Sequence, residues 1–374
     1  REALQATTAL DPREEDFLRY FQRLSKQFER ETARAALETA ILRRKADRKY
    51  PNANQLFFTR EALEQASSAD VSQHRAKRFE GLATAYDLGC SIGGDTMALA
   101  DMLPTIGVEL DPLRAEMARQ NLKACGLKGE IIQADITKLP FDIPSGSGIF
   151  LDPARRSGHR RIFNINYYQP PLSIINEWVG QGIPVCVKIS PGVKLEQLAG
   201  FDCEVEFISL NGGLKEAVLW FGSFKTTQFR ATLLPDGITM QTDDPASLPE
   251  PRICQPLAYL HEPDPAILRA GLVTQLAVDF DAFQLDPEIA YLTSETHPSS
   301  PWLRTWPVED WFHFSLKRLK AYLVEHDVGE LVVKKRGSPI QPDDLIRQLK
   351  LKGSQRRTVF LTQNAGKHIC VVCG

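Results

Sequence analysis

The sequence predicts an α/β protein built around a doubly wound, mostly parallel sheet. From about Ala83, short apolar runs alternate with helical patterns, which is typical of a parallel sheet with helices on both faces. A glycine-rich turn stands between the first of these runs and the helix after it. The chain has 374 residues, 43% of them hydrophobic, so we expect two or three domains.

Residues 1–80 are expected to form a helical cap ahead of the sheet. Apolar side chains recur at helical spacing over 17–41, and Pro51 interrupts the pattern. A second helical stretch is expected over 59–79. Thr59 is its predicted N-cap, because a hydroxyl oxygen there can accept a hydrogen bond from a free N–H group of the first turn.

Residues 81–225 are expected to hold the sheet itself. Helices are predicted between most strands, notably over 112–125 and 171–180. The segment Asn211-Gly212-Gly213 has hairpin chemistry, so the last two strands are expected to form an antiparallel edge pair. The predicted strands are seven short apolar runs: Ala85–Leu88, Thr105–Leu110, Glu130–Gln133, Gly148–Leu151, Val185–Ile189, Val205–Ser209 and Ala217–Phe221.

The rest of the chain is expected to contain a linker and a small α/β module. Residues 226–310 are predicted to be a linker or ancillary segment with short strands and a helix over 265–276. Residues 311–374 contain twelve Lys and Arg against five Asp and Glu, so we expect a basic module. Its predicted elements are helices Ser315–Glu325 and Pro342–Leu349 and strands Gly329–Lys334, Arg357–Thr362 and His368–Cys373.

Composition argues against several classes of protein. No apolar run approaches the roughly 20 residues that a membrane-spanning helix needs. Seven cysteines, an odd number, give no closed disulfide framework, so a reduced, cytoplasmic protein is expected. Cys370 and Cys373 stand without a second pair, and the histidines show no ligand spacing, so no metal is expected. The chain begins at Arg1 rather than Met, without a signal pattern, and whether residues precede it stays open.

The glycine-rich turn reads Asp87-Leu-Gly-Cys-Ser-Ile-Gly-Gly-Asp95. Glycine permits a tight turn there and a close approach of the backbone to a ligand. A dinucleotide fingerprint needs G-x-G-x-x-G, whereas Gly89, Gly93 and Gly94 fall as G-x-x-x-G-G. No G-x-x-x-x-G-K-[ST] run is present, which argues against a phosphate-binding loop.

This turn resembles motif I of the class I S-adenosylmethionine-dependent methyltransferases, usually D-x-G-x-G-x-G, with Ser91 at the place of the middle glycine. The resemblance implies a Rossmann-like, seven-stranded methyltransferase sheet and S-adenosyl-L-methionine as the cofactor. It also implies that Asp87, Gly89, Ser91 and Gly93 bind this cofactor.

Two further strand ends are similar to the same family. The second strand ends in Gly107-Val-Glu109-Leu-Asp111. The family has an acid there that accepts hydrogen bonds from both ribose hydroxyls, which implies this role for Glu109, with Asp111 as the alternative. The third strand leads to Asp135 and Ile136, which by the same resemblance contact the adenine amino group and ring. Ligands of open α/β sheets bind at such strand ends, which supports the assignment.

The fourth strand ends in Asp152-Pro153-Ala154-Arg155, at the place of the family's motif IV. Amino-methylating members have D/N-P-P-aromatic there, which implies that Asp152 and Pro153 orient the acceptor. Ala154 and Arg155 depart from that pattern, which leaves base stacking open, and Phe163, Tyr167 or Tyr168 could supply the aromatic ring instead. The predicted substrate contacts near the site are Arg155, Arg156, Tyr167 and Tyr168.

A covalent mechanism is not expected. Methylation at a pyrimidine C5 uses a cysteine after the fourth or fifth strand, but Ala154 and Ser190 occupy those places, and Cys186 lies inside a strand. Methylation of a nitrogen or an oxygen fits better.

Motif IV, the run Lys188-Ile-Ser-Pro-Gly192 and the C-terminal module together resemble bacterial-type class I methyltransferases with a THUMP-like C-terminal domain. True THUMP domains bind tRNA, so the resemblance implies RNA as the partner and methylation of a base nitrogen, with tRNA favoured by analogy. The basic residues predicted to hold the RNA backbone are Lys334, Lys335, Arg336, Arg356 and Arg357.

Two alternatives stay open. The acceptor of the methyl group could be a small molecule or a protein. Alternatively, Ser91 and the altered motif IV could mark an RNA-binding protein whose S-adenosylmethionine pocket is not catalytic.

Overall fold

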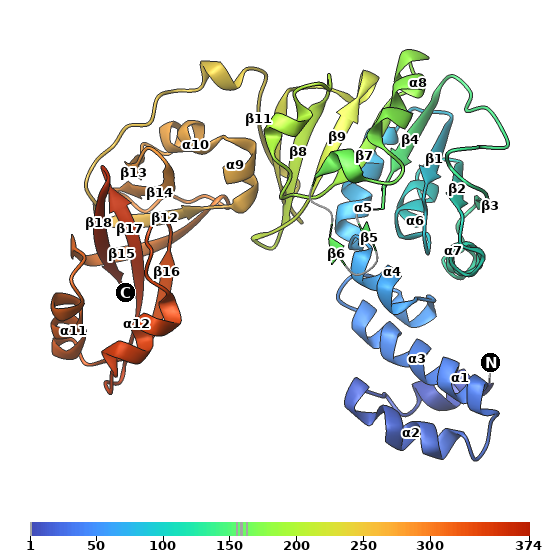
Figure 1. The fold of residues 1–374 in the computed structure, drawn as a ribbon, viewed down its shortest axis with the longest axis horizontal. Coiled ribbons are helices and arrows are strands. Elements are labelled where there is room, and N and C mark those ends of the chain that lie inside the picture. Colours follow the sequence, from blue (N-terminus) through green and yellow to red (C-terminus); the bar gives the residue numbers. More distant parts are fainter. Residues whose placement is uncertain (1, 155, 158–159, 162–163) are drawn as a thin grey trace. The chain divides into compact units, whose positions relative to one another are not determined.

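The computed structural model describes residues 2–154, 156–157, 160–161 and 164–374. Contacts divide the chain into two compact units (Figure 1). The first comprises 1–210, 215–226 and 234–237, and the second comprises 211–214, 227–233 and 238–374. No described helix is both long enough and apolar enough to cross a membrane.

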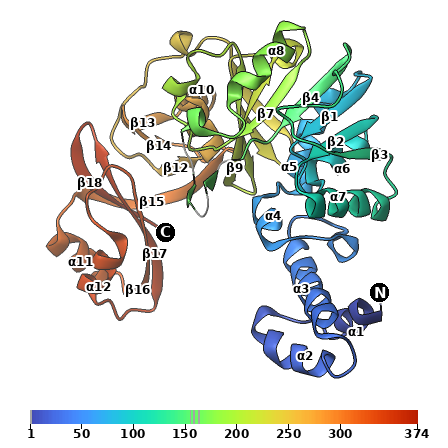
Figure 2. The same cartoon turned by 45° about the vertical axis from the view of Figure 1, so that its right-hand side comes forward.

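The helical cap consists of five short to medium helices. They are α1 (Glu2–Thr8), α2 (Phe17–Leu24), α3 (Arg30–Ala46), α4 (Arg60–Gln65) and α5 (Ala69–Ala76). The stretch predicted over 59–79 is therefore interrupted between α4 and α5. Thr59 is the N-cap as predicted, since its Oγ1 accepts from the N–H of Ala62 at 3.1 Å. Helices α1 and α2 lie at the far end of α3, whereas α4 and α5 lie near the sheet (Figure 2).

Among the described residues this sheet has nine strands rather than the predicted seven, and the seven that belong to the first unit follow the order β3-β2-β1-β4-β7-β9-β8. The pairs β1–β2, β1–β4, β2–β3 and β4–β7 are parallel, and β9 is antiparallel to β7. Asn211 and Gly212 turn the chain between β8 and β9 with φ of 54° and 71°, the left-handed values that the predicted hairpin needs. The doubly wound sheet is thus confirmed. The strands are β1 (Thr84–Leu88), β2 (Thr105–Glu109), β3 (Gly129–Gln133), β4 (Ser147–Leu151), β7 (Val185–Ile189), β8 (Glu204–Leu210) and β9 (Gly213–Phe221).

Helices cover this sheet, and the cap contributes to its hydrophobic cores. The principal helices after β1 are α6 (Gly94–Ala100), α7 (Pro112–Ala124) and α8 (Ile175–Gly180). Leu56 and Phe58 of the cap share one cluster with Ile92 and Leu122. Phe79 shares another cluster with strand residues such as Phe150 and Trp220. Because the cap buries its apolar face against the core, it is part of this unit rather than a separate domain.

Buried ion pairs also join the cap to the sheet. Arg75 at the end of α5 is 2% exposed and pairs with both Asp95 of α6 and Glu216 of β9. Two residues nearby act similarly: Arg78 pairs with Glu204 at 2.6 Å, and His74 contacts Glu206 at 2.7 Å. A buried charge is stable only with such partners, so these contacts fix the position of α5.

The second unit contains a seven-stranded sheet in the order β13-β14-β12-β15-β18-β17-β16. Strands β12 (Tyr259–Pro263), β13 (Phe283–Asp286), β14 (Ile289–Ser294) and β15 (Leu303–His313) come largely from the segment predicted to be a linker. They share the sheet with β16 (Val328–Lys335), β17 (Gln355–Asn364) and β18 (Lys367–Cys373). The boundary predicted at 310/311 falls inside β15, so the ancillary segment and the terminal module form one structure.

The helices of the second unit are short. The helix predicted over 265–276 is two helices, α9 (Pro265–Ala270) and α10 (Val273–Asp279), because Gly271 has a left-handed φ of 74°. Helices α11 (Leu316–Glu325) and α12 (Pro342–Leu349) pack their apolar faces on the sheet through Leu319, Leu323 and Leu345. The hairpin β10 (Phe229–Leu234) and β11 (Ile238–Thr242) is antiparallel.

Arg75→Met is expected to lower the free energy of unfolding of the first unit by about 3–5 kcal/mol, because it leaves the buried carboxylates of Asp95 and Glu216 without their cation. Urea unfolding followed by circular dichroism would measure the loss. Arg34→Met is the matched control. It removes an exposed ion pair with Glu38 and should cost less than about 0.5 kcal/mol. Equal effects of the two substitutions would contradict the stabilising role of Arg75.

Candidate cofactor and acceptor site

The glycine-rich turn leaves β1 in a left-handed conformation at three positions. The φ angles of Gly89, Ser91 and Gly93 are 86°, 51° and 82°. A side chain at Gly93 would also lie 3.2 Å from the Cβ of Ala118, so this glycine is required by both conformation and space. Ser91 adopts the left-handed conformation although it carries a side chain, which explains why the usual pattern has glycine at that place.

The side chain of Glu109, at the end of β2, binds the backbone of the glycine-rich turn. Its Oε2 accepts from the backbone N–H of Ser91 at 2.8 Å, and its Oε1 accepts from that of Asp111 at 2.9 Å. Each carboxylate oxygen has a second lone pair, so the same group can still accept from two hydroxyls. Asp111 instead caps α7 by accepting from the N–H of Arg114 at 2.9 Å. Of the two acids proposed for the ribose, Glu109 is therefore the better placed.

Asp87 lies under the turn and is fully buried. Its Oδ2 accepts from the hydroxyl of Thr96 at 2.5 Å, while its Oδ1 has no hydrogen-bond partner among the described residues. Burial, and next the negative charge of Asp95, raise the pKa of Asp87 to about 8, and the hydrogen bond from Thr96 opposes that rise. At neutral pH the free protein therefore holds a proton on this carboxyl, and a cationic donor from a bound ligand would favour the ionised form and donate to its Oδ1.

Asp135 follows β3 at the same edge of the sheet. Its Oδ1 accepts from both the backbone N–H of Thr137 at 2.8 Å and the Thr137 hydroxyl at 2.7 Å, and these bonds lower the pKa of Asp135. The carboxylate therefore has a fixed orientation. Ile136 beside it is half-buried.

Asp152 follows β4 and lies next to the turn. A side chain at Gly89 would come within 3.6 Å of the Asp152 carbonyl oxygen, which places the proposed acceptor residue beside the cofactor loop. The Nζ of Lys188 donates to Oδ2 of Asp152 at 2.7 Å. Lys188 belongs to β7 and is only 3% exposed.

Lys188 is a site residue that the sequence prediction missed. The signal was a single lysine within the apolar strand run Val185–Ile189. A lysine so deeply buried needs an anionic or polar partner, but the sequence does not show which one. The parallel pairing of β4 with β7 provides this partner, because it places Lys188 beside Asp152.

The segment after Asp152 is only partly described. Arg155 lies outside the described residues, as does the side chain of Arg156, and Pro153 is buried. Tyr167 is exposed, so its ring is available to a substrate. Tyr168 was predicted to contact substrate but is 1% exposed, and its hydroxyl accepts from the N–H of Ser190 at 3.3 Å. Its ring supports the chain after β7 and is not available for stacking.

The five predicted RNA-binding cations do not form one cluster. Strands β16 and β17 are parallel, so Lys334 and Lys335 lie at one end of the pair, whereas Arg356 and Arg357 lie at the other. Four of the five are also paired with carboxylates: Lys334 and Arg336 with Glu262, Arg356 with Glu330, and Arg357 with Glu309. Among the described residues, no group of His, Cys, Asp and Glu side chains could hold a metal ion.

Comparison with known proteins decides the family. The chain is 36% identical over 339 residues to a protein named "Uncharacterized S-adenosylmethionine-dependent methyltransferase" in two strains of Mycobacterium tuberculosis. The alignment covers 87% of this chain and 92% of that protein. The chain belongs to the S-adenosylmethionine-dependent methyltransferases.

Two further similarities agree with this assignment. Residues 303–374 match the family described as THUMP domain-like, which confirms the predicted THUMP-like end of this methyltransferase. The crystal structure of a "putative methyltransferase" from Porphyromonas gingivalis W83 has a TM-score of 0.79 and 21% identity. The alignment covers 97% of this chain and 98% of the chain in that crystal structure, which supports the fold.

The residues at the sheet edge of this methyltransferase fit S-adenosylmethionine. The left-handed turn at Gly89 and Gly93 allows the backbone to approach a ligand, Glu109 has lone pairs left that could accept from a diol, and Oδ1 of Asp87 has no hydrogen-bond partner among the described residues. When bound, S-adenosylmethionine supplies a methyl group on a sulfonium. The chain would hold this group beside Asp152.

Glu109→Gln is expected to weaken the binding of S-adenosylhomocysteine about 100-fold. The amide NH2 of glutamine would face the N–H of Ser91 or of Asp111, and the negative charge would be lost. Isothermal titration calorimetry would measure the dissociation constant. Glu116→Gln, an exposed change on α7, is the control and should have no effect. A dissociation constant for Glu109→Gln within threefold of the wild-type constant would contradict the assignment of Glu109 to the ribose.

Asp87→Asn is expected to remove a pH dependence of stability. Because the native pKa of about 8 lies above the usual 3.8, the folded protein holds a proton between about pH 4 and pH 8 that the unfolded chain has released. Relative to the Asp87→Asn variant, the free energy of unfolding of the wild type should therefore fall as pH rises from 6 to 8, by up to about 1.4 kcal/mol per pH unit.

Urea unfolding of both proteins at pH 6, 7 and 8 would measure this difference. Asp142→Asn, at an exposed aspartate, is the control. If the free energies of unfolding of the wild type and of Asp87→Asn change equally with pH, Asp87 is ionised throughout this range.

Proposed function

We propose that this methyltransferase transfers a methyl group from S-adenosylmethionine to a nitrogen of an RNA base, with Asp152 orienting the acceptor. The observation that carries this proposal is the pair of Asp152 and Lys188 beside the cofactor loop, with 2.7 Å between Lys188 Nζ and Asp152 Oδ2. The site thus offers an oriented carboxylate where the transferred methyl group would lie.

A carboxylate in this place suits an amine acceptor. It can accept hydrogen bonds at several lone-pair positions, so an amino group can donate to Asp152 while Lys188 keeps its own bond. Holding one N–H in this way directs the nitrogen lone pair towards the methyl carbon. As the N–C bond forms and the C–S bond breaks, the nitrogen becomes positive, and Asp152 can accept the proton that it releases. Most of the rate gain would come from positioning.

RNA as the acceptor rests on the THUMP-like match over 303–374. THUMP domains are RNA-binding modules, so tRNA or another structured RNA is the favoured substrate by analogy. Exposed Tyr167 and the arginines at 155, 156, 160 and 161 provide the residue types that stack on bases and contact phosphates.

One observation favours a different acceptor. Lys334, Arg336, Arg356 and Arg357 are paired with carboxylates rather than presented as a continuous basic surface. A small-molecule or protein acceptor would not need such a surface. It would also make methyl transfer insensitive to ribonuclease and weakly dependent on salt.

The test is transfer of labelled methyl from S-adenosylmethionine to total RNA from a strain that lacks the gene. Wild type should label the RNA, and ribonuclease should remove the label. Asp152→Ala should reduce labelling at least about 100-fold, because it removes the group that orients the amine and accepts its proton. Lys188→Met should reduce it about tenfold or more through misplacement of Asp152, and S-adenosylhomocysteine should still bind both variants.

Asp202→Ala, which removes an exposed carboxylate, is the matched control and should label RNA normally. Full labelling by Asp152→Ala would rule out its role. Absence of RNA labelling by wild type that still binds the cofactor would favour a protein or metabolite acceptor or, if these also stay unlabelled, a non-catalytic pocket.

A further inference from the structure

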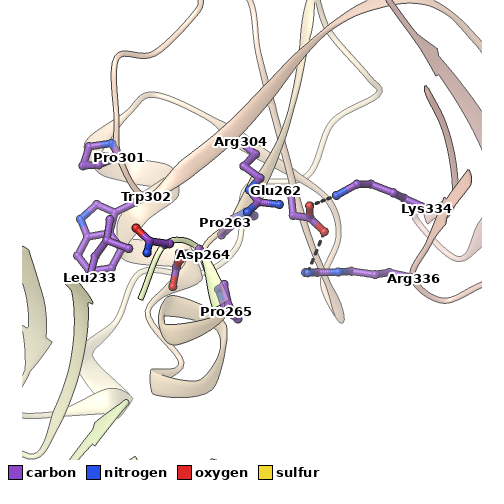
Figure 3. A pocket seen from close by; sticks show the side chains of 12 residues that line it. Leu233, Glu262, Pro263, Asp264, Pro265, Pro301, Trp302, Arg304, Lys334 and Arg336 are labelled. Carbon is purple, nitrogen blue, oxygen red and sulfur yellow. Dashed lines mark hydrogen bonds and ion pairs between the residues drawn. The ribbon is translucent and has the colours of Figure 1, made fainter. Parts of the chain in front are cut away.

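A cationic pocket lies in the second unit, in sequence far from the cofactor loop. Its volume is about 450 Å³. Figure 3 shows its charged side chains around Glu262, which lies between Arg304 and the pair Lys334 and Arg336. Asp264 completes the charged lining, so three cations face two carboxylates, and the pocket has a net charge of +1.

Lys334 and Arg336 are held in place before any ligand arrives. Lys334 lies over the ring of Trp306, 4.7 Å from its centre, and the guanidinium of Arg336 lies 4.9 Å from the centre of the Tyr291 ring. Both donate to the Glu262 carboxylate. Cations fixed in this way lose little conformational freedom when they bind an anion.

Arg304 is the third cation of the pocket and lies on β15, the strand that pairs with β12. The pairing of β12 with β15 places it directly opposite Glu262. Arg304 is exposed, and its guanidinium makes no hydrogen bond or ion pair with any described residue. The Nη1 of Arg336 is likewise without a hydrogen-bond partner among the residues described. The pocket therefore contains more donor capacity than Glu262 uses.

We propose that this pocket binds a phosphate monoester. A doubly charged phosphate has acceptor oxygens in several directions, which suits two guanidinium groups and an ammonium group that converge from two sides. The volume suits a group of the size of a mononucleotide. Glu262 then keeps Lys334 and Arg336 in position in the free protein and competes with the ligand for them.

The phosphate could belong to a free nucleotide or to the terminal phosphate of an RNA chain. The chemistry of recognition is the same in both cases, so the experiment must separate them. This proposal goes beyond the methyl-transfer reaction, and binding can be measured without S-adenosylmethionine. Its failure is therefore distinct from failure of the proposed function.

The test is isothermal titration of the full chain with inorganic phosphate, uridine 5′-monophosphate, uridine, and a short RNA with or without a 5′-phosphate. Uridine compounds avoid competition at the proposed adenosine site. The two phosphate compounds should bind and uridine should not. A strong preference for the 5′-phosphorylated RNA over uridine 5′-monophosphate would identify RNA as the source, and equal affinity would identify the free nucleotide.

Two variants should change affinity in opposite directions. Arg304→Ala should weaken phosphate binding about tenfold, because a charged hydrogen bond is lost at an exposed side chain whose removal leaves the core intact. Glu262→Gln should strengthen binding about tenfold, since it removes the competing carboxylate. Lys320→Met, which changes an exposed lysine of α11 that does not line the pocket, is the control.

No binding of phosphate or uridine 5′-monophosphate at millimolar concentration would overturn the proposal. The same holds if Glu262→Gln, with an unchanged melting temperature, binds phosphate more weakly than wild type. In that case Glu262 with its two cations would be a structural ion-pair cluster only.

Discussion

The buried guanidinium of Arg75 connects the parts of the first unit that the cofactor and acceptor site needs. It pairs with Asp95, the last residue of the glycine-rich turn, and with Glu216 on β9, and Arg75 itself belongs to the helical cap. Asp95 also accepts from Ser72 at 2.6 Å. Because an uncompensated charge cannot stay in this interior, cap, turn and strand must keep one arrangement together.

The same low-dielectric interior explains why the pKa values of Asp87 and Asp95 shift in opposite directions. Asp95 has Arg75 beside it, which lowers its pKa against the effect of burial. Within the described part of the chain, the Asp87 carboxyl accepts a hydrogen bond from the Thr96 hydroxyl alone, and burial together with the charge of Asp95 raises its pKa. Two neighbouring carboxylates thus have opposite shifts, because only one of them directly pairs with the arginine. Lys188 gives Asp152 a cation of its own, and the proposed acceptor group is therefore oriented by a buried partner.

The cofactor side of the site was predictable because it depends on local sequence order. In a parallel sheet the carboxyl ends of successive strands meet at one edge, so acids that follow β1, β2 and β3 lie together by topology. The resemblance assigned the ribose to Glu109, with Asp111 as the alternative, and the capping bond of Asp111 to Arg114 supports Glu109. Tyr168 could not be placed, because Tyr167 beside it has the same chemistry and only packing decides which ring is buried.

The sequence by itself determined the order of strands and helices, the glycine-rich turn, the strand-end acids and the family. These features depend on periodicity, turn chemistry and spacing, which are local properties of the chain. Only the tertiary structure decided that Lys188 meets Asp152, that Arg75 holds the cap, that the predicted linker pairs into the sheet of the second unit, and that Arg304 and Glu262 face one pocket. These contacts join residues distant in sequence, and strand pairing and burial select them from many partners of equal chemistry.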